Sequence, residues 1–250
     1  MKKTKDIRTL ALIGEEAFEK LNSCRVTIIG LGGVGGIASE MLVRAGVSHL
    51  KLIDFDVFDA SNRNRQLGAL ISTEGRKKVE VFKERFLDID EDAEIETISE
   101  PLTNENVEEL LKSSDYIIDM CDDVDAKCAI IKYSVDNKIP FISAMGAGNR
   151  TDISKLFIKK LSKTSYCPLA KKLRQNLHKR YQDKTKVAYY EGETVSVDKN
   201  LGFVGTISYS PNFMGIKIVS EVINDIIKRW LYGFTWYYFQ NRWRWGRSSN

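Results

Sequence analysis

Short apolar runs alternate with longer amphipathic segments between residues 25 and 145 of this chain. The runs are rich in β-branched residues, which is typical of strands buried in a sheet. They read VTIIG, HLKLID, EIETIS, DYIIDM and KIPFISAM. The segments between them repeat apolar residues at helical spacing, as Val79, Phe82 and Phe86 do after Thr73, a candidate helix cap. Strands that alternate with helices predict βαβ units and a mainly parallel sheet.

The pattern changes outside this region. Residues 14–22, before the first strand, predict a short helix. In the second half, three strands and two helices are expected: strands in ISKLFIKKL, VAYYEG and GFVGTISYSP, one basic helix in PLAKKLRQNLHKRY and one apolar helix in NFMGIKIVSEVINDIIKRW. All four tryptophans lie between residues 230 and 250, where no helical or strand period is evident. We therefore expect one domain over residues 1–230 and a separate aromatic and basic tail over 231–250.

Composition narrows the class of protein. A chain of 250 residues with 43% hydrophobic and 29% charged residues is long enough and apolar enough to bury a core. The N-terminus lacks the uncharged apolar run of a signal peptide, so a cytoplasmic location is expected. Four scattered cysteines form no C-x-x-C pair, and we expect no zinc. The charge is uneven, because residues 159–186 hold ten Lys or Arg residues and one acid.

A glycine-rich turn follows the first predicted strand. Gly30, Gly32 and Gly35 have the G-x-G-x-x-G spacing, and Gly33 adds further bare backbone. A strand before this turn and a helix after it are typical of a nucleotide site, where backbone N–H groups and the helix dipole face a phosphate. Asp54 ends the next strand. These features predict an α/β fold with a Rossmann-like, doubly wound, mainly parallel sheet, extended by antiparallel strands in the C-terminal half.

The polar loop DFDVFDASNRNRQ after the second strand indicates which nucleotide chemistry is present. Its Asn62, Arg65 and Gln66, followed by Lys78, are more than a hydride-transfer enzyme requires. A triphosphate needs cations, which Arg65 and Lys78 supply, and its Mg²⁺ needs a carboxylate, for which Asp122 lies at another strand end. A solvated loop with surface ion pairs is the alternative.

Together these residues resemble a known superfamily. The GLGGVG turn, Asp54 in LIDFD, the SNRNRQ loop, Lys78 in RKKVE and Asp122 in IDMCDD are similar to the adenylating enzymes that include ubiquitin-activating enzymes and bacterial activators of sulfur carriers. The lead-in RTLALIGEEAFEKL, the NRNRQ form of the loop, PLAKKLR and GTISYSP most resemble the tRNA threonylcarbamoyladenosine dehydratases. Residues 1–230 are therefore expected to form one ThiF-type adenylating domain.

The resemblance implies a role for each site residue. Asp54 would hold the ribose of ATP, Asn62 and Arg65 the phosphates, Lys78 the developing charge, and Asp122 the Mg²⁺; the resemblance also implies cofactor-binding positions at Gly30, Gly32, Gly33, Gly35 and Gln66. It further implies a homodimer in which Arg8 reaches the partner subunit's site. The reaction would adenylate the carboxylate of threonylcarbamoyladenosine in tRNA, and an internal nucleophile would then close the ring and release AMP.

Three questions stay open in the sequence. The chain could instead adenylate the C-terminus of a ubiquitin-like sulfur carrier, although such enzymes usually carry two C-x-x-C zinc pairs, and sulfur-relay proteins are possible partners in either case. A nucleotide-sensing module without catalysis is a further alternative. Cys167 stands where relatives have an acid, and a chance thiol is the simpler interpretation. The tail over 231–250 could be a membrane-interface segment or a non-native or altered terminus.

Overall fold

Seven strands form one sheet in the computed structural model, which describes residues 4–198 and 202–242. Their order is β3-β2-β1-β4-β5-β7-β6. β6 runs antiparallel to β7, and the other neighbours are parallel. The strands are β1 Arg25–Ile29, β2 His49–Ile53, β3 Glu94–Ile98, β4 Tyr116–Asp119, β5 Phe141–Ala144, β6 Leu156–Lys160 and β7 Lys186–Tyr190. The predicted α/β class and mainly parallel sheet are confirmed.

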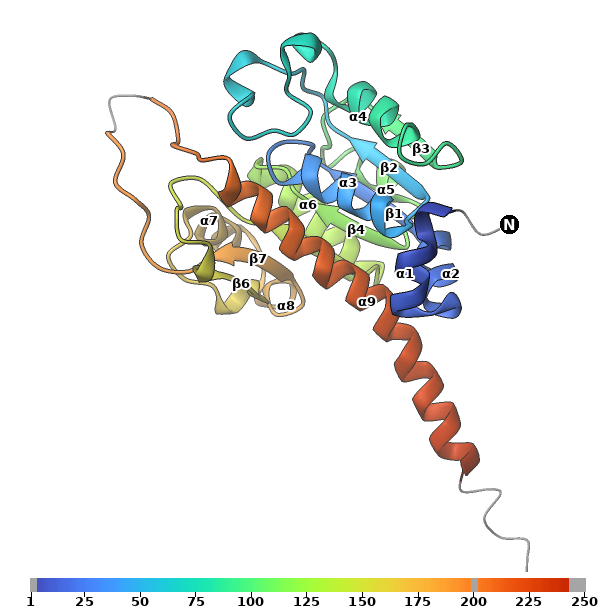
Figure 1. Cartoon of the computed structure of the whole chain (residues 1–250). Helices are drawn as coiled ribbons and strands as arrows, with labels where there is room; N and C mark the ends of the chain where they lie inside the picture. Colours follow the sequence, from blue (N-terminus) through green and yellow to red (C-terminus); the bar gives the residue numbers. More distant parts are fainter. Residues whose placement is uncertain (1–3, 199–201, 243–250) are drawn as a thin grey trace, which may run out of the picture.

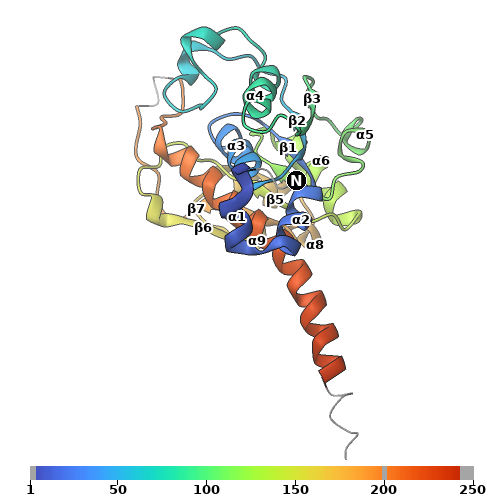
Figure 2. The same ribbon diagram turned by 45° about the vertical axis from the view of Figure 1, so that its right-hand side comes forward.

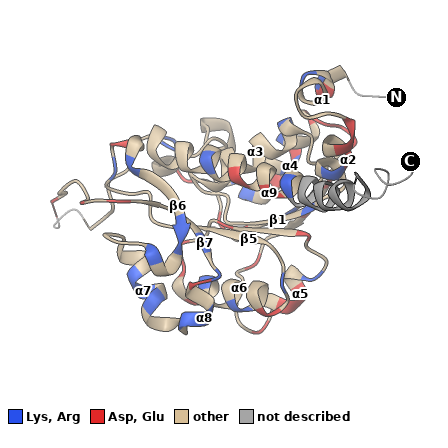
Figure 3. Cartoon of the chain, turned by 90° about the horizontal axis from the view of Figure 1, so that it is seen from below, with Lys and Arg blue, Asp and Glu red and all other residues tan. Residues whose placement is uncertain are grey.

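Helices cover both faces of the sheet (Figure 1). Seen edge-on, α3, α4 and α9 lie on one face with α1 and α2 at their side, and α5 to α8 lie on the other (Figure 3). The α-helices are α1 Ile7–Ile13, α2 Glu15–Ser23, α3 Gly35–Ala45, α4 Lys78–Leu87, α5 Val107–Leu111, α6 Val124–Asp136, α7 Pro168–Asn176, α8 Lys179–Gln182 and α9 Tyr209–Arg242. Single 3-10 turns are η1 Thr4–Asp6, η2 Ala60–Asn62, η3 Ile71–Thr73, η4 Ile153–Lys155 and η5 Leu161–Lys163.

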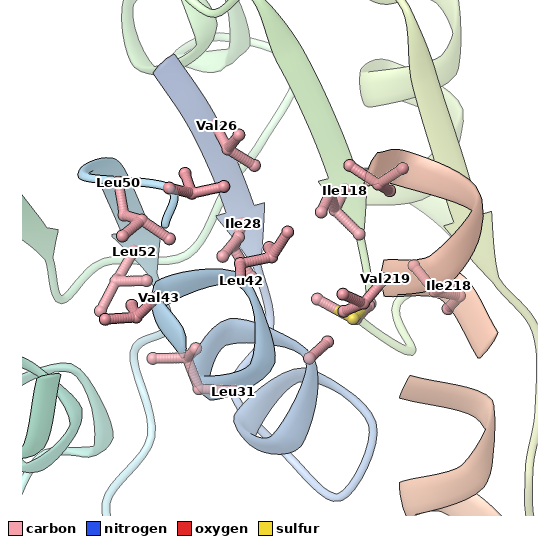
Figure 4. Close-up of a cluster of buried hydrophobic side chains, with 14 of the residues drawn as sticks. Val26, Ile28, Leu31, Leu42, Val43, Leu50, Leu52, Ile118, Ile218 and Val219 are labelled. Carbon is pink, nitrogen blue, oxygen red and sulfur yellow. The ribbon is translucent and has the colours of Figure 1, made fainter. Parts of the chain in front are cut away.

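Each face of the sheet has its own apolar core. Val26 and Ile28 of β1 pack with Leu42 of α3 and Ile218 of α9 in the first core (Figure 4). Ile29, the next residue of β1, packs in the second core, beneath α6 and α7. Because successive side chains of a strand point to opposite faces, a strand buried on both sides reads as a continuous apolar run, as the sequence does here.

The strand order places the carboxyl ends of β1 and β4 side by side, with β2 beyond β1. After β1 the chain adds β2 and β3 toward one edge of the sheet, and it then returns to add β4 on the opposite edge of β1. The direction of strand order therefore reverses at a switch point between β1 and β4. Ligands of open α/β sheets bind in the crevice outside such a point. The loops that follow these strands are those that carry the predicted site residues.

Several expected elements differ from the structure. GFVGTISYSP forms no strand in its described residues, because Gly205 and Thr206 bond to loop residues Asn149 and Asn64 and α9 begins at Tyr209. Pro211 lies in the first turn of α9, where a missing N–H costs little. The expected basic helix is two helices, since Leu177 is extended and buried. Thr73 caps η3 rather than α4.

The structure also contains helical segments near both ends of the chain that the sequence did not predict. α1 was not expected, and it lies beside α2 (Figure 2), which in turn contacts α9. α9 continues into the aromatic tail as far as Arg242, and residues 243–250 of that tail lie outside the described residues. None of the helices in the described ranges combines the length and apolar character needed to cross a bilayer.

Candidate nucleotide-binding site

A cleft of about 810 Å³ lies at the carboxyl edge of the sheet, within the size range of small-ligand sites. The loops after β1, β2, β4 and β5 line it. The structure brings nine of the predicted site residues together around this cleft: Gly30, Gly32, Gly33, Asp54, Asn62, Arg65, Gln66, Lys78 and Asp122. Segments that are far apart in the sequence therefore meet at one place.

The glycine turn packs closely on its surroundings. Gly30 has a φ of 88°, and a Cβ there would lie 2.7 Å from the Met120 carbonyl oxygen. A Cβ at Gly35, the first residue of α3, would lie 1.8 Å from the Gly30 carbonyl oxygen. Only glycine fits at these two positions. Gly35 is buried and does not line the cleft, so its contribution is to let α3 start directly behind the turn, with its positive dipole end toward the cleft.

Asp54 follows β2 and is held by the backbone. The N–H groups of Leu31 and Asp56 donate to its two oxygens at 2.6 and 2.8 Å. Burial raises the pKa of Asp54, and Lys78 and the two N–H groups partly offset this effect. Each carboxylate oxygen accepts about two hydrogen bonds, so acceptor capacity remains toward the cleft.

Lys78 begins α4 and is 5% exposed. Its Nζ lies 2.8 Å from Asp56 Oδ2 and 4.0 Å from Asp54 Oδ1. Asp56 also accepts the Lys78 backbone N–H through its carbonyl oxygen. Sequence reasoning did not single out Asp56, although the alternation of the two acids in LIDFD would have placed both on one side of the loop. The ion pair fixes the Lys78 ammonium at the rim of the cleft.

The loop of η2 presents Asn62, Arg65 and Gln66. Asp59 and Asn62 cap η2 reciprocally, with Asp59 accepting from Ser61 N–H. Arg65 donates to the Ser61 carbonyl oxygen and to Asn64 Oδ1, both at 2.9 Å. It has no carboxylate partner among the described residues, so its charge is free for an anion.

Gln66 provides an independent indication of a ligand. Its side chain is 8% exposed, and its Oε1 has no hydrogen-bond partner in the described part of the chain. A buried polar atom without a partner is costly, and a bound donor removes that cost. Gln66 lines the cleft, and its Nε2 is beside the glycine turn, 3.8 Å from where a Cβ at Gly32 would stand. A polar ligand therefore fits this end of the site.

Asp122 follows β4 and is exposed on the cleft. It makes no ion pair or side-chain hydrogen bond within the described ranges, whereas its neighbour Asp123 caps α6 by accepting the Ala126 N–H at 2.7 Å. A free carboxylate beside a phosphate site fits Mg²⁺, which takes one or two carboxylates together with phosphate oxygens and water. Leu102, Met120 and Ala126 supply an apolar wall that suits a base.

Like Gly35, the predicted site residue Arg8 lies outside the cleft lining, and so does Cys167, whose role the sequence left open. Arg8 is exposed on α1 and does not line the cleft of its own chain. Cys167 is buried at the residue before α7 and does not line the cleft, although Leu169 two residues later does. The far wall of the cleft, formed by Gly146, Gly148 and Thr206, was missed because the glycine pair there has no recognisable phosphate-loop spacing.

These features agree with comparisons to known proteins. The sequence profile of the ThiF family matches residues 4–243. This chain belongs to the ThiF family. The resemblance inferred from the glycine turn and the SNRNRQ loop is thereby confirmed. Within the ThiF family, a tRNA threonylcarbamoyladenosine dehydratase from Bacillus subtilis is 40% identical over 168 residues, covering 67% of this chain and 66% of that protein.

Other ThiF-like proteins are also similar to this chain. A molybdopterin-synthase adenylyltransferase from Haemophilus influenzae is 33% identical over 159 residues, covering 64% of this chain and 65% of that protein. The chain thus aligns with just under two thirds of the length of each of these two relatives. A crystal structure of the Escherichia coli tRNA N6-threonylcarbamoyladenosine dehydratase in complex with ATP superposes with a TM-score of 0.85 at 29% identity. That match covers 90% of this chain and 94% of the other.

Proposed function

We propose that this chain is an ATP-dependent tRNA threonylcarbamoyladenosine dehydratase. One observation carries the proposal. A single cleft combines a glycine turn, two cations and a free carboxylate, in a chain that is 40% identical to a tRNA threonylcarbamoyladenosine dehydratase and 33% identical to a molybdopterin-synthase adenylyltransferase. The bound ATP of the related Escherichia coli dehydratase supports the same nucleotide here.

ATP lies across the cleft in this proposal. The base packs on Leu102 and Ala126, and the ribose hydroxyls donate to Asp54 through its remaining lone pairs. The phosphates lie over the glycine turn at the start of α3, where N–H groups and the helix dipole stabilise negative charge. Arg65 and Lys78 balance the charge that develops on the phosphates during attack. Asn62 donates from its amide, whose oxygen already caps η2.

Asp122 is the residue that would hold Mg²⁺, with the remaining ligands supplied by phosphate oxygens and water. When bound, the ion supplies Lewis-acid charge stabilisation to the phosphates. The position at the end of β4 leaves the carboxylate exposed, and its neighbour Asp123 is occupied by capping α6. Asp122 thus acts as a ligand without weakening a helix start.

The reaction follows from the weakness of a carboxylate as an electrophile. The threonyl carboxylate of the modified adenosine attacks the α-phosphorus of ATP, and pyrophosphate leaves. An internal nucleophile of the modified base then attacks the activated carbonyl carbon, the ring closes and AMP leaves. The nucleoside loses one water in total. The protein supplies positioning and electrostatics and needs no nucleophilic side chain.

Pyrophosphate exchange into ATP tests this function. Exchange should depend on tRNA that carries threonylcarbamoyladenosine and should be absent with the same tRNA lacking the modification. Exchange that instead requires a sulfur-carrier protein would favour the alternative activity. No exchange with either substrate would favour a nucleotide-sensing module and would contradict both enzymes.

A further inference from the structure

A fully buried ion pair lies beneath the nucleotide cleft. Lys127 of α6 and Asp119 of β4 both have side chains with 0% exposure, and Lys127 Nζ lies 2.9 Å from Asp119 Oδ2. Lys127 also donates to Ser143 Oγ at 3.1 Å and to the Ala144 carbonyl oxygen at 2.8 Å. The Ser143 hydroxyl donates to Asp119 Oδ2 at 2.6 Å. All three ammonium donors therefore have acceptors.

The pair connects three elements that end at the cleft. Asp119 and Ser143 are register neighbours on β4 and β5, and Lys127 lies in the first turns of α6. A buried cation tolerates its loss of water only where its donors are satisfied at fixed positions. The network thus determines how the end of β4, the end of β5 and the start of α6 lie relative to one another.

The other oxygen of Asp119 faces the loop that carries Asp122. Asp119 Oδ1 accepts the Cys121 backbone N–H at 3.3 Å and the Cys121 thiol at 3.1 Å. On its opposite side the peptide between Met120 and Cys121 packs on Gly30, so closely that a Cβ at Gly30 would lie 2.8 Å from Cys121 N. This peptide is held from two sides, and Asp122 is the next residue.

A purely space-filling role does not account for this arrangement. Apolar side chains of similar volume would fill the same core without desolvating two charges. They would provide no acceptor for the Cys121 N–H, and the segment before Asp122 would then be held by the Met120 N–H bond to the Ile29 carbonyl oxygen and by packing on Gly30. The ionic network supplies direction as well as volume.

We propose that Lys127 is a positioning residue for the adenylation site: it fixes Asp119, which in turn holds the loop from Met120 to Asp123 so that Asp122 faces the metal of the bound nucleotide. Lys127 touches neither nucleotide nor metal. The inference rests on the proposed function, because it assumes that Asp122 is used as a metal ligand.

The test is the affinity of the full-length protein for ATP, measured by calorimetry with Mg²⁺ and with EDTA. Wild type should bind more tightly with Mg²⁺. In Lys127→Met this gain should fall by about tenfold, as is typical when a group that orients a metal ligand is removed. ATP binding in EDTA should be unchanged. Lys186→Met is the control, because Lys186 of β7 pairs with Glu221 and Asp225 of α9, away from the cleft lining.

A milder pair of variants decides the matter if Lys127→Met does not fold. Ser143→Ala removes two hydrogen bonds from the network, the one from Lys127 Nζ and the one to Asp119 Oδ2. Ser134→Ala removes only a bond to the Ile130 carbonyl oxygen on the same helix α6. Both serines are buried with 0% exposure. Ser143→Ala should lower the Mg²⁺-dependent gain, and Ser134→Ala should leave it unchanged.

Two results would overturn the inference while leaving the proposed function intact. One is a folded Lys127→Met or Ser143→Ala protein that keeps the whole Mg²⁺-dependent gain. The other is a variant that loses affinity equally in Mg²⁺ and in EDTA, which would indicate a general structural role. Wild type that binds no ATP under either condition would instead remove the proposed function and this inference with it.

Discussion

Among single residues, Asp122 can act as a metal ligand because its carboxylate is not already bound to another side chain of the described residues. It is exposed on the cleft and has no side-chain partner among residues 4–198 and 202–242. Replacing it removes no packing and no hydrogen bond. Loss of a group that only orients a metal ligand costs up to about 100-fold. Because Asp122 is the ligand itself in the proposed function, we predict that Asp122→Ala lowers pyrophosphate exchange by at least about that factor.

The control for this variant is Asp125→Ala, an exposed acid in the first turn of α6 that does not line the cleft. Both variants should melt cooperatively, close to the wild-type temperature. Exchange by Asp122→Ala at the wild-type rate in saturating Mg²⁺ would show that the metal has other ligands.

At the scale of elements, one carboxylate joins the helix behind the glycine turn to the helix that begins with Lys78. Glu40 of α3 accepts from Arg85 of α4 at 2.5 Å and from Arg44 of α3 at 2.8 Å. Burial alone would raise the pKa of Glu40, but the hydrogen bonds from Arg85 and Arg44 outweigh it and hold the pKa below its ordinary value. The folded state therefore favours the charged form.

This contact predicts a pH dependence of stability. A depressed pKa contributes stability that is present above the unfolded-state value, about 4.3 for Glu, and is lost as the pH falls through the lower folded-state value. The difference in urea midpoint between wild type and Glu40→Gln should be largest at neutral pH and should shrink below about pH 4.3. The exposed Glu109→Gln should show no such trend. A constant difference across this range would exclude the contact as its source.

The helices α7 and α8 carry the basic segment noted in the sequence, and Figure 3 shows its cations along them. The structure shows which of these cations already have a partner within the protein. Arg174 donates to Thr164 Oγ1 and Arg180 pairs with Asp136, whereas Lys171, Lys172 and Lys179 are exposed and have no ion-pair partner among the described residues. Leu169 of α7 lines the cleft, so the start of α7 is adjacent to the site.

We predict that these three lysines bind tRNA phosphates. Replacing Lys171, Lys172 and Lys179 together by Gln should flatten the dependence of log affinity on log salt by roughly one unit for each phosphate that the protein no longer neutralises. Exposed lysines of the opposite layer, Lys20, Lys83 and Lys217, provide the control triple. An unchanged slope in the first triple would place the tRNA path elsewhere.

The sequence predicted the elements that have a strong local signal. The five strands before residue 145 and the helices α3, α4 and α6 have clear periods, and their order determines which loops meet. It could not predict the segment from Gly202 to Ser208, whose backbone bonds to distant loops, or the break at Leu177, which tertiary burial imposes. The Lys127–Asp119 pair was also hidden, because a lysine in a helical pattern reads as a solvated side chain.

At the scale of the whole molecule, the position of Arg8 makes a dimer testable. Arg8 lies on α1, outside the cleft of its own chain. If it serves the partner subunit's site, Arg8→Ala should remove transition-state stabilisation of about 3 kcal/mol. Mixing Arg8→Ala chains with Lys78→Ala chains should restore one working site per mixed dimer, measured by pyrophosphate exchange. Failure to complement would mean that Arg8 acts within its own chain or not at all.

The dehydration itself is measured on the nucleosides of the tRNA product. The purified protein is incubated with ATP, Mg²⁺ and tRNA that carries threonylcarbamoyladenosine, and the tRNA is digested to nucleosides under mild conditions for mass spectrometry. We predict a modified adenosine lighter than its precursor by one water, with one AMP released for each nucleoside converted, and no product from Asp122→Ala. An unchanged nucleoside in a sample whose protein is folded and binds ATP would contradict this prediction.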